Sequence, residues 1–176
     1  MKVNAVLIMG RTLLLLAAVL TAATFFASPA RATSTYFDGV SGFETYATST
    51  EGRFSGIATG DLPGAWQAVV KHAPLSGSAP AAITGGSFAL ATVFAGSPAT
   101  VSGSIAGGSV TQVTGFAGCV NQQYKVVGTM SSVGLAGGAQ NGKGALDITL
   151  THYQTRVFGF CLTYSATVTG AISLKF

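Results

Sequence analysis

Apolar and polar residues alternate with a period of two along much of the chain, most clearly at its end. Over 162–176 one set of alternate positions is mostly apolar, while the other carries mainly Thr, Ser and Lys. Alternation sustained over roughly 15 residues is typical of a long strand with one buried face. The apolar set consists of Leu162, Tyr164, Ala166, Val168, Gly170, Ile172, Leu174 and Phe176. We predict that this set faces a core.

The same pattern predicts further strands earlier in the chain. Residues 145–153 alternate likewise, and residues 154–159 link them to the last strand as its antiparallel neighbour. Residues 100–105 and 109–113 flank Ala106-Gly107-Gly108, which predicts a short hairpin. The remaining predicted strands are 52–59, 66–72, 87–94 and 124–133, with a turn at 61–64 between the first two.

Seven to nine strands with short glycine-rich connections and hardly any helix signal indicate an all-β protein. Such a string favours an antiparallel β-barrel or a barrel-like β-sandwich, and the long last strand inclines the prediction towards a barrel. The length of 176 residues fits one domain, and the 48% apolar content supplies a core although only 8% of residues are charged.

The first 32 residues have the three parts of an export signal. Lys2 and Arg11 precede the apolar run 12–27, which is followed by Ser-Pro-Ala-Arg-Ala. We predict a signal peptide over 1–32 and a single secreted domain over 33–176, with either Met1 or Met9 as the true start. An uncleaved anchor is the alternative, but a run of about 16 residues is shorter than the roughly 20 that cross a bilayer. The alanine-rich leader favours a bacterial source and an extracellular location.

The charge of the remaining chain argues against a nucleic-acid partner. Beyond residue 32, six basic residues face five acidic ones and are scattered along the sequence. Binding to nucleic acid requires clustered Lys and Arg that neutralise several phosphates. No phosphate-binding or dinucleotide motif occurs either, so no cofactor is predicted.

The two cysteines, Cys119 and Cys161, both lie in the predicted secreted part. An even number of cysteines in an exported protein favours a disulfide between them. Buried free thiols and a metal site are the alternatives, and the absence of a CxxC motif or a nearby His argues against the metal.

Histidines and carboxylates are the candidates for catalysis. His72 and His152 each need an orienting acid and a reacting partner to act as a general base, and neither lies in a known motif. His152 falls on the apolar face of its predicted strand, where a hydrogen-bonded core histidine is the ordinary outcome. The carboxylates Asp38, Glu44, Glu51 and Asp61 lie close together in sequence. No calcium-loop spacing joins them, and Asp61 is explained by its turn. An enzyme is therefore the less favoured class, and no metal is predicted.

Aromatic residues suggest where a ligand would bind. Trp66 is the only tryptophan, and Tyr46 and Phe54 lie near it in sequence. A lone tryptophan in a short strand is more often a core anchor than a stacking platform. These three residues are nevertheless the predicted ligand-binding set.

The chain end allows a second location. With Phe176 after alternating apolar positions, about 13 residues resemble the terminal strand of bacterial outer-membrane barrels, whose smallest members are close to this length. The resemblance implies an outer-membrane location. Clear aromatic girdles and long polar outer loops are missing from the sequence, which argues against it.

The leading prediction is a secreted, non-catalytic β-domain protein that binds a small apolar ligand, a cell-envelope glycan or a protein partner. The alternatives are a small outer-membrane barrel and an extracellular hydrolase or isomerase that uses His72 or His152 with a carboxylate.

Overall fold

The computed structural model describes residues 33–136, 138 and 140–176. The predicted signal peptide, 1–32, lies outside the described residues. Within the described part eight strands follow one another and no residue is helical. The strands are β1 (Thr35–Ala47), β2 (Glu51–Gly60), β3 (Gly64–His72), β4 (Ala81–Phe94), β5 (Ser97–Thr114), β6 (Gln122–Leu135), β7 (Gly142–Val157) and β8 (Phe160–Lys175).

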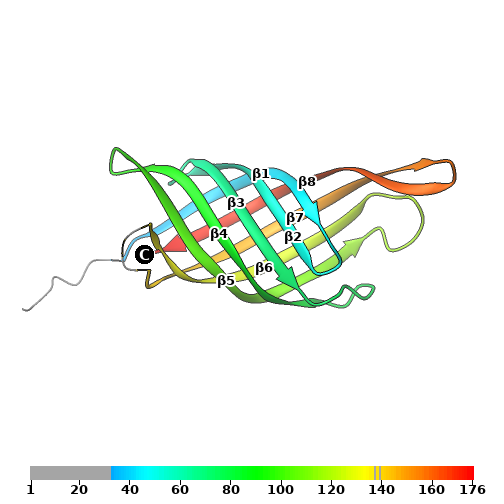
Figure 1. The fold of residues 1–176 in the computed structure, drawn as a ribbon, viewed down its shortest axis with the longest axis horizontal. Helices are drawn as coiled ribbons and strands as arrows, with labels where there is room; N and C mark the ends of the chain where they lie inside the picture. Colours follow the sequence, from blue (N-terminus) through cyan, green and yellow to red (C-terminus); the bar gives the residue numbers. More distant parts are fainter. Residues whose placement is uncertain (1–32, 137, 139) are drawn as a thin grey trace, which may run out of the picture. The chain divides into compact units, whose positions relative to one another are not determined.

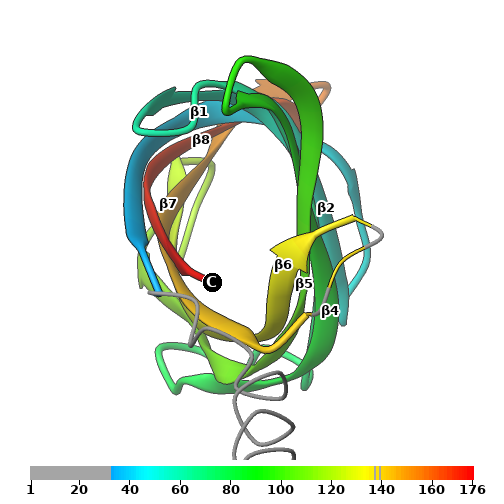
Figure 2. The ribbon, with the colours of Figure 1, turned by 90° about the vertical axis from the view of Figure 1, so that its left-hand side faces the viewer.

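The strands form a closed up-and-down barrel, in which each strand pairs antiparallel with its neighbours in sequence. The ring closes between β1 and β8, where Val40 lies opposite Gly170 (Figure 2). The predicted all-β fold is thus confirmed, as a barrel rather than a sandwich. Closure pairs the backbone N–H and C=O groups of the first and last strands, which would otherwise be exposed sheet edges.

The barrel interior is filled by the apolar side chains that the alternation pointed inward. Leu146, Ile148 and Leu150 of β7 are buried, while Asp147 between them faces out and pairs with Lys125. An eight-stranded barrel is just wide enough for side chains to fill it or to hold one small ligand. Most of the interior is therefore core.

Trp66 is the largest fully buried side chain, with 0% of its surface exposed. Its partner in β2 is Gly56, which pairs in turn with Gly42 of β1. A methyl group on either glycine would meet the backbone of the opposite strand, so the two glycines let β1 and β2 approach closely beside the indole. The indole Nε1–H donates to the Ser41 carbonyl at 3.2 Å, so the polar atom of the ring is satisfied.

One end of the barrel is closed by side chains. The rings of Tyr36, Phe94 and Phe176 pack together with centroid separations of 5.1 to 6.0 Å. Leu62, in the connection between β2 and β3, is buried at the same end. Phe176 therefore has a packing role inside this barrel.

We call the opposite end the mouth. It is framed by four connections, residues 48–50, 73–80, 115–121 and 158–159, because alternate turns of an up-and-down barrel lie at the same end (Figure 1).

The structure differs from the sequence-based strand assignment at several places, among them the predicted link 154–159, whose residues 154–157 belong to β7. The hairpin predicted around Ala106-Gly107-Gly108 is wrong, because β5 runs unbroken through it as one 18-residue strand. Strand β1 was not predicted, since its apolar positions are interrupted by Gly39 and Gly42. A register shift in the β7–β8 pairing leaves Leu162 and Tyr164 exposed rather than facing the core.

Candidate functional site

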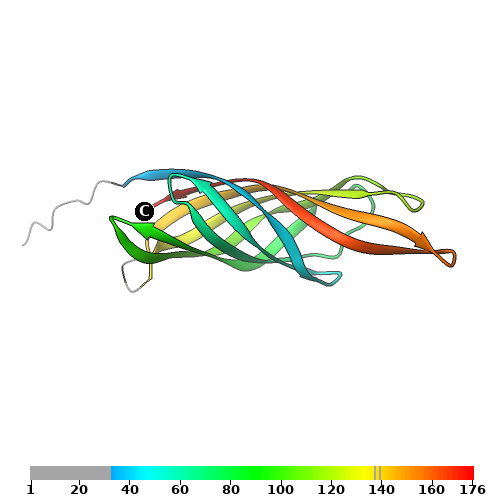
Figure 3. The same ribbon diagram turned by 90° about the horizontal axis from the view of Figure 1, so that it is seen from above.

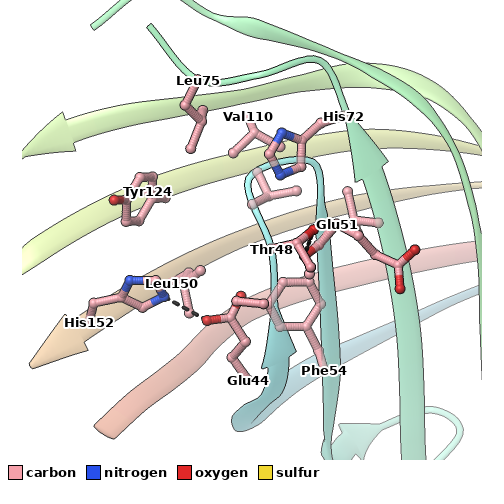
Figure 4. Close-up of a pocket in the computed structure, with 14 residues that line it drawn as sticks. Glu44, Thr48, Glu51, Phe54, His72, Leu75, Val110, Tyr124, Leu150 and His152 are labelled. Carbon is pink, nitrogen blue, oxygen red and sulfur yellow. Dashed lines mark hydrogen bonds and ion pairs between the residues drawn. The ribbon is translucent and has the colours of Figure 1, made fainter. Parts of the chain in front are cut away.

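A cavity of about 140 Å³ opens at the barrel mouth (Figure 4). Its wall is apolar and includes Phe54, Val126 and Leu150. Polar side chains join this wall from four strands: Glu44, His72, Tyr124 and His152. The volume is close to that of an engineered apolar cavity of about 150 Å³ that accepts benzene. A small ring with a polar substituent matches both its size and its lining.

Glu44 and His152 form a hydrogen-bonded pair in this cavity. His152 Nε2 lies 2.6 Å from Glu44 Oε2, with side-chain exposures of 17% and 8%. A register shift follows Glu44 in the β1–β2 pairing, and bulges of this kind re-aim side chains next to functional sites. Gly52 leaves the neighbouring space open, since a methyl group there would meet the Phe54 ring and Glu44 Oε1. Local backbone features therefore position the carboxylate.

The hydrogen bonds of the two histidines assign their ring nitrogens. An ionised carboxylate accepts only, so Nε2–H of His152 donates to Glu44. His72 Nδ1 lies 2.7 Å from the Ala73 carbonyl and donates to it for the same reason. In the neutral form of either imidazole the other ring nitrogen is then an acceptor. The site consequently offers acceptors to a molecule in the cavity.

Tyr124 adds an oxygen and an aromatic surface to this group. Its ring centroid lies 5.1 Å from that of His152, and its hydroxyl donates to Gln122 Oε1 at 2.9 Å. Burial, with the negative charge of Glu44 as a smaller cause, raises the pKa of the Tyr124 hydroxyl above its usual value. The phenol stays protonated, and its remaining lone pairs are acceptors.

The three residues predicted to bind a ligand do not converge on one place. Phe54 lines the cavity. Trp66 lies inside the core, bound to Ser41. Tyr46 is half-exposed and packs under the Arg53 guanidinium, 5.0 Å from its ring centroid. Glu44, Tyr124 and Leu150 were not predicted from the sequence as cavity residues. For Leu150 alone the sequence held a clue, because it lies on the same predicted strand face as His152.

The carboxylates that lie close in sequence separate into two groups in the fold. Glu44 and Glu51 lie at the mouth, and Asp38 and Asp61 lie at the closed end. Asp38 Oδ1 accepts from the Leu62 N–H at 2.8 Å, while its buried Oδ2 has no hydrogen-bond partner among the described residues. Burial raises the pKa of Asp38, partly offset by that hydrogen bond. The Asp38 carboxylate is therefore buried far from the cavity, at a cost in folding free energy when it is ionised.

Cys119 and Cys161 are neighbours, but the predicted disulfide is not formed in the structure. Both thiols are free, and the pair lies 2.7 Å apart, longer than the roughly 2.05 Å of an S–S bond. Cys119 belongs to the connection between β5 and β6, and Cys161 lies on β8. The pair joins the β5–β6 connection to the start of β8, next to the turn at 158–159.

Among the described residues no three His, Cys, Asp or Glu side chains are grouped as a metal site would need. In the same part of the chain we find no helix of the length and apolar character that a bilayer crossing requires.

Fold and site together define a closed eight-stranded β-barrel with a small, acceptor-lined cavity at one mouth. The chain matches no family model, and no curated protein or solved structure is significantly similar to it.

Proposed function

We propose that this protein is an exported binding protein whose barrel mouth holds a small, largely apolar molecule carrying a hydrogen-bond donor. The observation that carries the proposal is the buried Glu44–His152 pair set in an apolar cavity. Small-molecule sites are mostly apolar concavities in which a few polar groups fix the orientation of the ligand. Because the polar atoms of this site accept hydrogen bonds, the ligand supplies the proton, as a hydroxyl or amine does.

The apolar interior supports a barrel that works in water. Membrane barrels are apolar outside and polar within. Here the apolar side chains of β8 that precede Phe176, such as Leu174 and Ile172, are buried inside, and Thr169 and Lys175 face out. Export by the leader 1–32 and a bacterial source remain part of the proposal.

The proposal is tested with 4-fluorophenol, which carries one ring and one donor, followed by ¹⁹F NMR line broadening. The matched ligand is 4-fluoroanisole, in which a methyl group replaces the donated proton. We expect 4-fluorophenol to bind at least about tenfold more tightly, since an unpaired buried polar group costs roughly 1–3 kcal/mol. Equal binding of the two ligands, or no binding of either, contradicts the proposal.

Protein variants locate the binding site. His152→Phe removes the acceptor and Phe54→Ala removes part of the apolar wall, so both weaken 4-fluorophenol binding. Tyr46→Ser is the matched control, because Tyr46 is half-exposed and does not line the cavity. If the Tyr46 variant loses affinity and the other two variants do not, the binding site lies elsewhere.

A second candidate function rests on the same pair. A carboxylate that orients an imidazole is the arrangement of a general base, so an exported hydrolase or isomerase is the alternative. The test compares hydrolysis of 4-nitrophenyl acetate by the wild type and by the double variant His72→Gln, His152→Gln. If the wild type is faster and the variant keeps the wild-type melting temperature, the enzyme is favoured. Equal rates favour binding alone.

A further inference from the structure

The paired ends of β7 and β8 extend beyond the other strands at the mouth (Figure 3). This aromatic hairpin, residues 153–164, carries large apolar side chains in water. Phe158 is 97% exposed, Phe160 73%, Tyr164 67% and Leu162 50%. Single exposed apolar residues are ordinary, but a contiguous group on a projecting element marks an interaction site.

The backbone gathers these side chains on one face and at the apex. Val157 lies opposite Phe160, and two positions back Thr155 lies opposite Leu162, so these four residues share a face. Phe158 forms the apex with Gly159, at φ values of 48° and 86°, as a tight two-residue hairpin turn requires. A non-glycine residue with positive φ is uncommon, and here it presents a phenylalanine ring at the outermost point.

The other face of the aromatic hairpin carries its one cation and a cysteine. Arg156 lies opposite Cys161, and Cys161 contacts Cys119 of the β5–β6 connection. That connection exposes two further apolar side chains at the mouth, Phe116 and Val120. Residues 113–123 contain no charged residue, and residues 153–164 contain only Arg156.

We propose that the aromatic hairpin docks the protein onto a lipid surface. Aromatic rings are favoured at the interface between lipid and water, and the lone cation Arg156 suits anionic headgroups. A narrow two-stranded tip is poorly shaped to bury the roughly 800 Å² per partner of a stable protein interface, whereas it can enter a headgroup layer. Docking brings the mouth close to the lipid. The proposal is independent of what the cavity binds.

The test is sedimentation with vesicles of phosphatidylcholine mixed with phosphatidylglycerol. The hairpin variant is Phe158→Ser, Phe160→Ser. The matched control is Phe37→Ser, Phe43→Ser, which removes two rings that are 64% and 60% exposed on the barrel wall. We expect the hairpin variant to lose at least about tenfold in vesicle affinity, because two rings that would be buried among the lipids are replaced by polar side chains. The control keeps the wild-type affinity.

All proteins come from the full-length chain, so any contribution of the leader is common to them, and circular dichroism melting checks their folding. Equal sedimentation of the hairpin variant and the wild type overturns the proposal, as does a wild type that stays in solution. Light scattering without vesicles tests for a dimer. If the wild type forms a concentration-dependent dimer and the hairpin variant does not, the apolar face binds a second copy of the chain, which also overturns the proposal. Neither of these outcomes changes the affinity for 4-fluorophenol. The lipid-docking proposal can therefore be wrong while the proposed function holds, and the reverse.

Discussion

Glu44 and His152 are 108 positions apart in the chain, yet their side chains meet at 2.6 Å inside the barrel mouth. Glu44 lies on β1 and His152 on β7, with β8 between them in the sheet. On β8 the residue paired with His152 is Ala166, whose methyl group leaves room for the contact. Closure of the barrel between β1 and β8 thus creates the polar centre of the cavity.

Removal of His152 is expected to destabilise the fold as well as to weaken binding. His152→Phe leaves the largely buried Glu44 carboxylate without its partner, at a cost of about 2 kcal/mol for a hydrogen bond to a charged group. Urea unfolding measures the change in the free energy of unfolding. Arg53→Gln is the control, since it breaks the exposed Glu51–Arg53 pair and is expected to cost less than about 1 kcal/mol. An equal cost for both variants contradicts a buried pair.

Asp38 is expected to make the protein less stable as pH rises. Its folded-state pKa lies above the ordinary value of 3.8, so the folded state holds this proton more tightly than the unfolded state. The resulting stabilisation is full below the unfolded pKa and is lost as pH rises through the folded one. Asp38→Asn keeps the acceptor for the Leu62 N–H and removes the charge. The melting temperature of the variant relative to wild type should therefore increase from pH 3 to pH 7, and a constant difference refutes the assignment.

The cysteine pair is expected to close into a disulfide when the protein meets a disulfide-exchange oxidant. Two thiols lose two protons and two electrons to that oxidant, and the mass falls by about 2 Da. The new loop of about 43 residues is worth roughly 4 kcal/mol in the chain-entropy model. Cys161 raises the pKa of the Cys119 thiol, so the reaction should accelerate towards alkaline pH. Intact mass before and after reduction checks this, with Cys161→Ser as the control; an unchanged wild-type mass refutes it.

Trp66 is expected to report on packing rather than on ligand binding. Trp66→Ala should cost about 3–5 kcal/mol, as removal of a buried aromatic ring does. Tryptophan fluorescence should be blue-shifted in the wild type and unchanged by 4-fluorophenol, because Trp66 is not a cavity residue. Quenching by the ligand at saturating concentration contradicts this placement.

The all-β fold was predictable because inward and outward residues alternate along the strands. Over Leu146–Leu150 and Val168–Leu174 the apolar positions predicted to face a core are buried, apart from the side-chain-free Gly170. The pattern failed where glycines weaken it, at Gly107-Gly108 in β5, because such a pair is equally compatible with a turn and with a strand that approaches its neighbour closely.

The candidate site was only partly predictable. Alternation placed His152 on an inward face, but which residue meets it depends on the strand order and the register across the closing seam. Neither is encoded in local periodicity, so Glu44 was not paired with His152 beforehand. Trp66, Tyr46 and Phe54 are close in sequence, yet only Phe54 reaches the cavity. Trp66 faces inward too but is buried in the core and is not a cavity residue, and after the register shift at Glu44 Tyr46 pairs with the exposed Arg53.

The central claim is that the barrel mouth binds a small apolar donor molecule, and amide chemical-shift mapping tests it most directly. The ¹H–¹⁵N spectrum of the protein is recorded during titration with 4-fluorophenol. We predict that the largest shifts cluster on Glu44, Phe54, Leu150 and His152, with no comparable change at the closed end around Asp38. Shifts confined to the outer wall or to the closed end, or none at saturating ligand, would contradict the account.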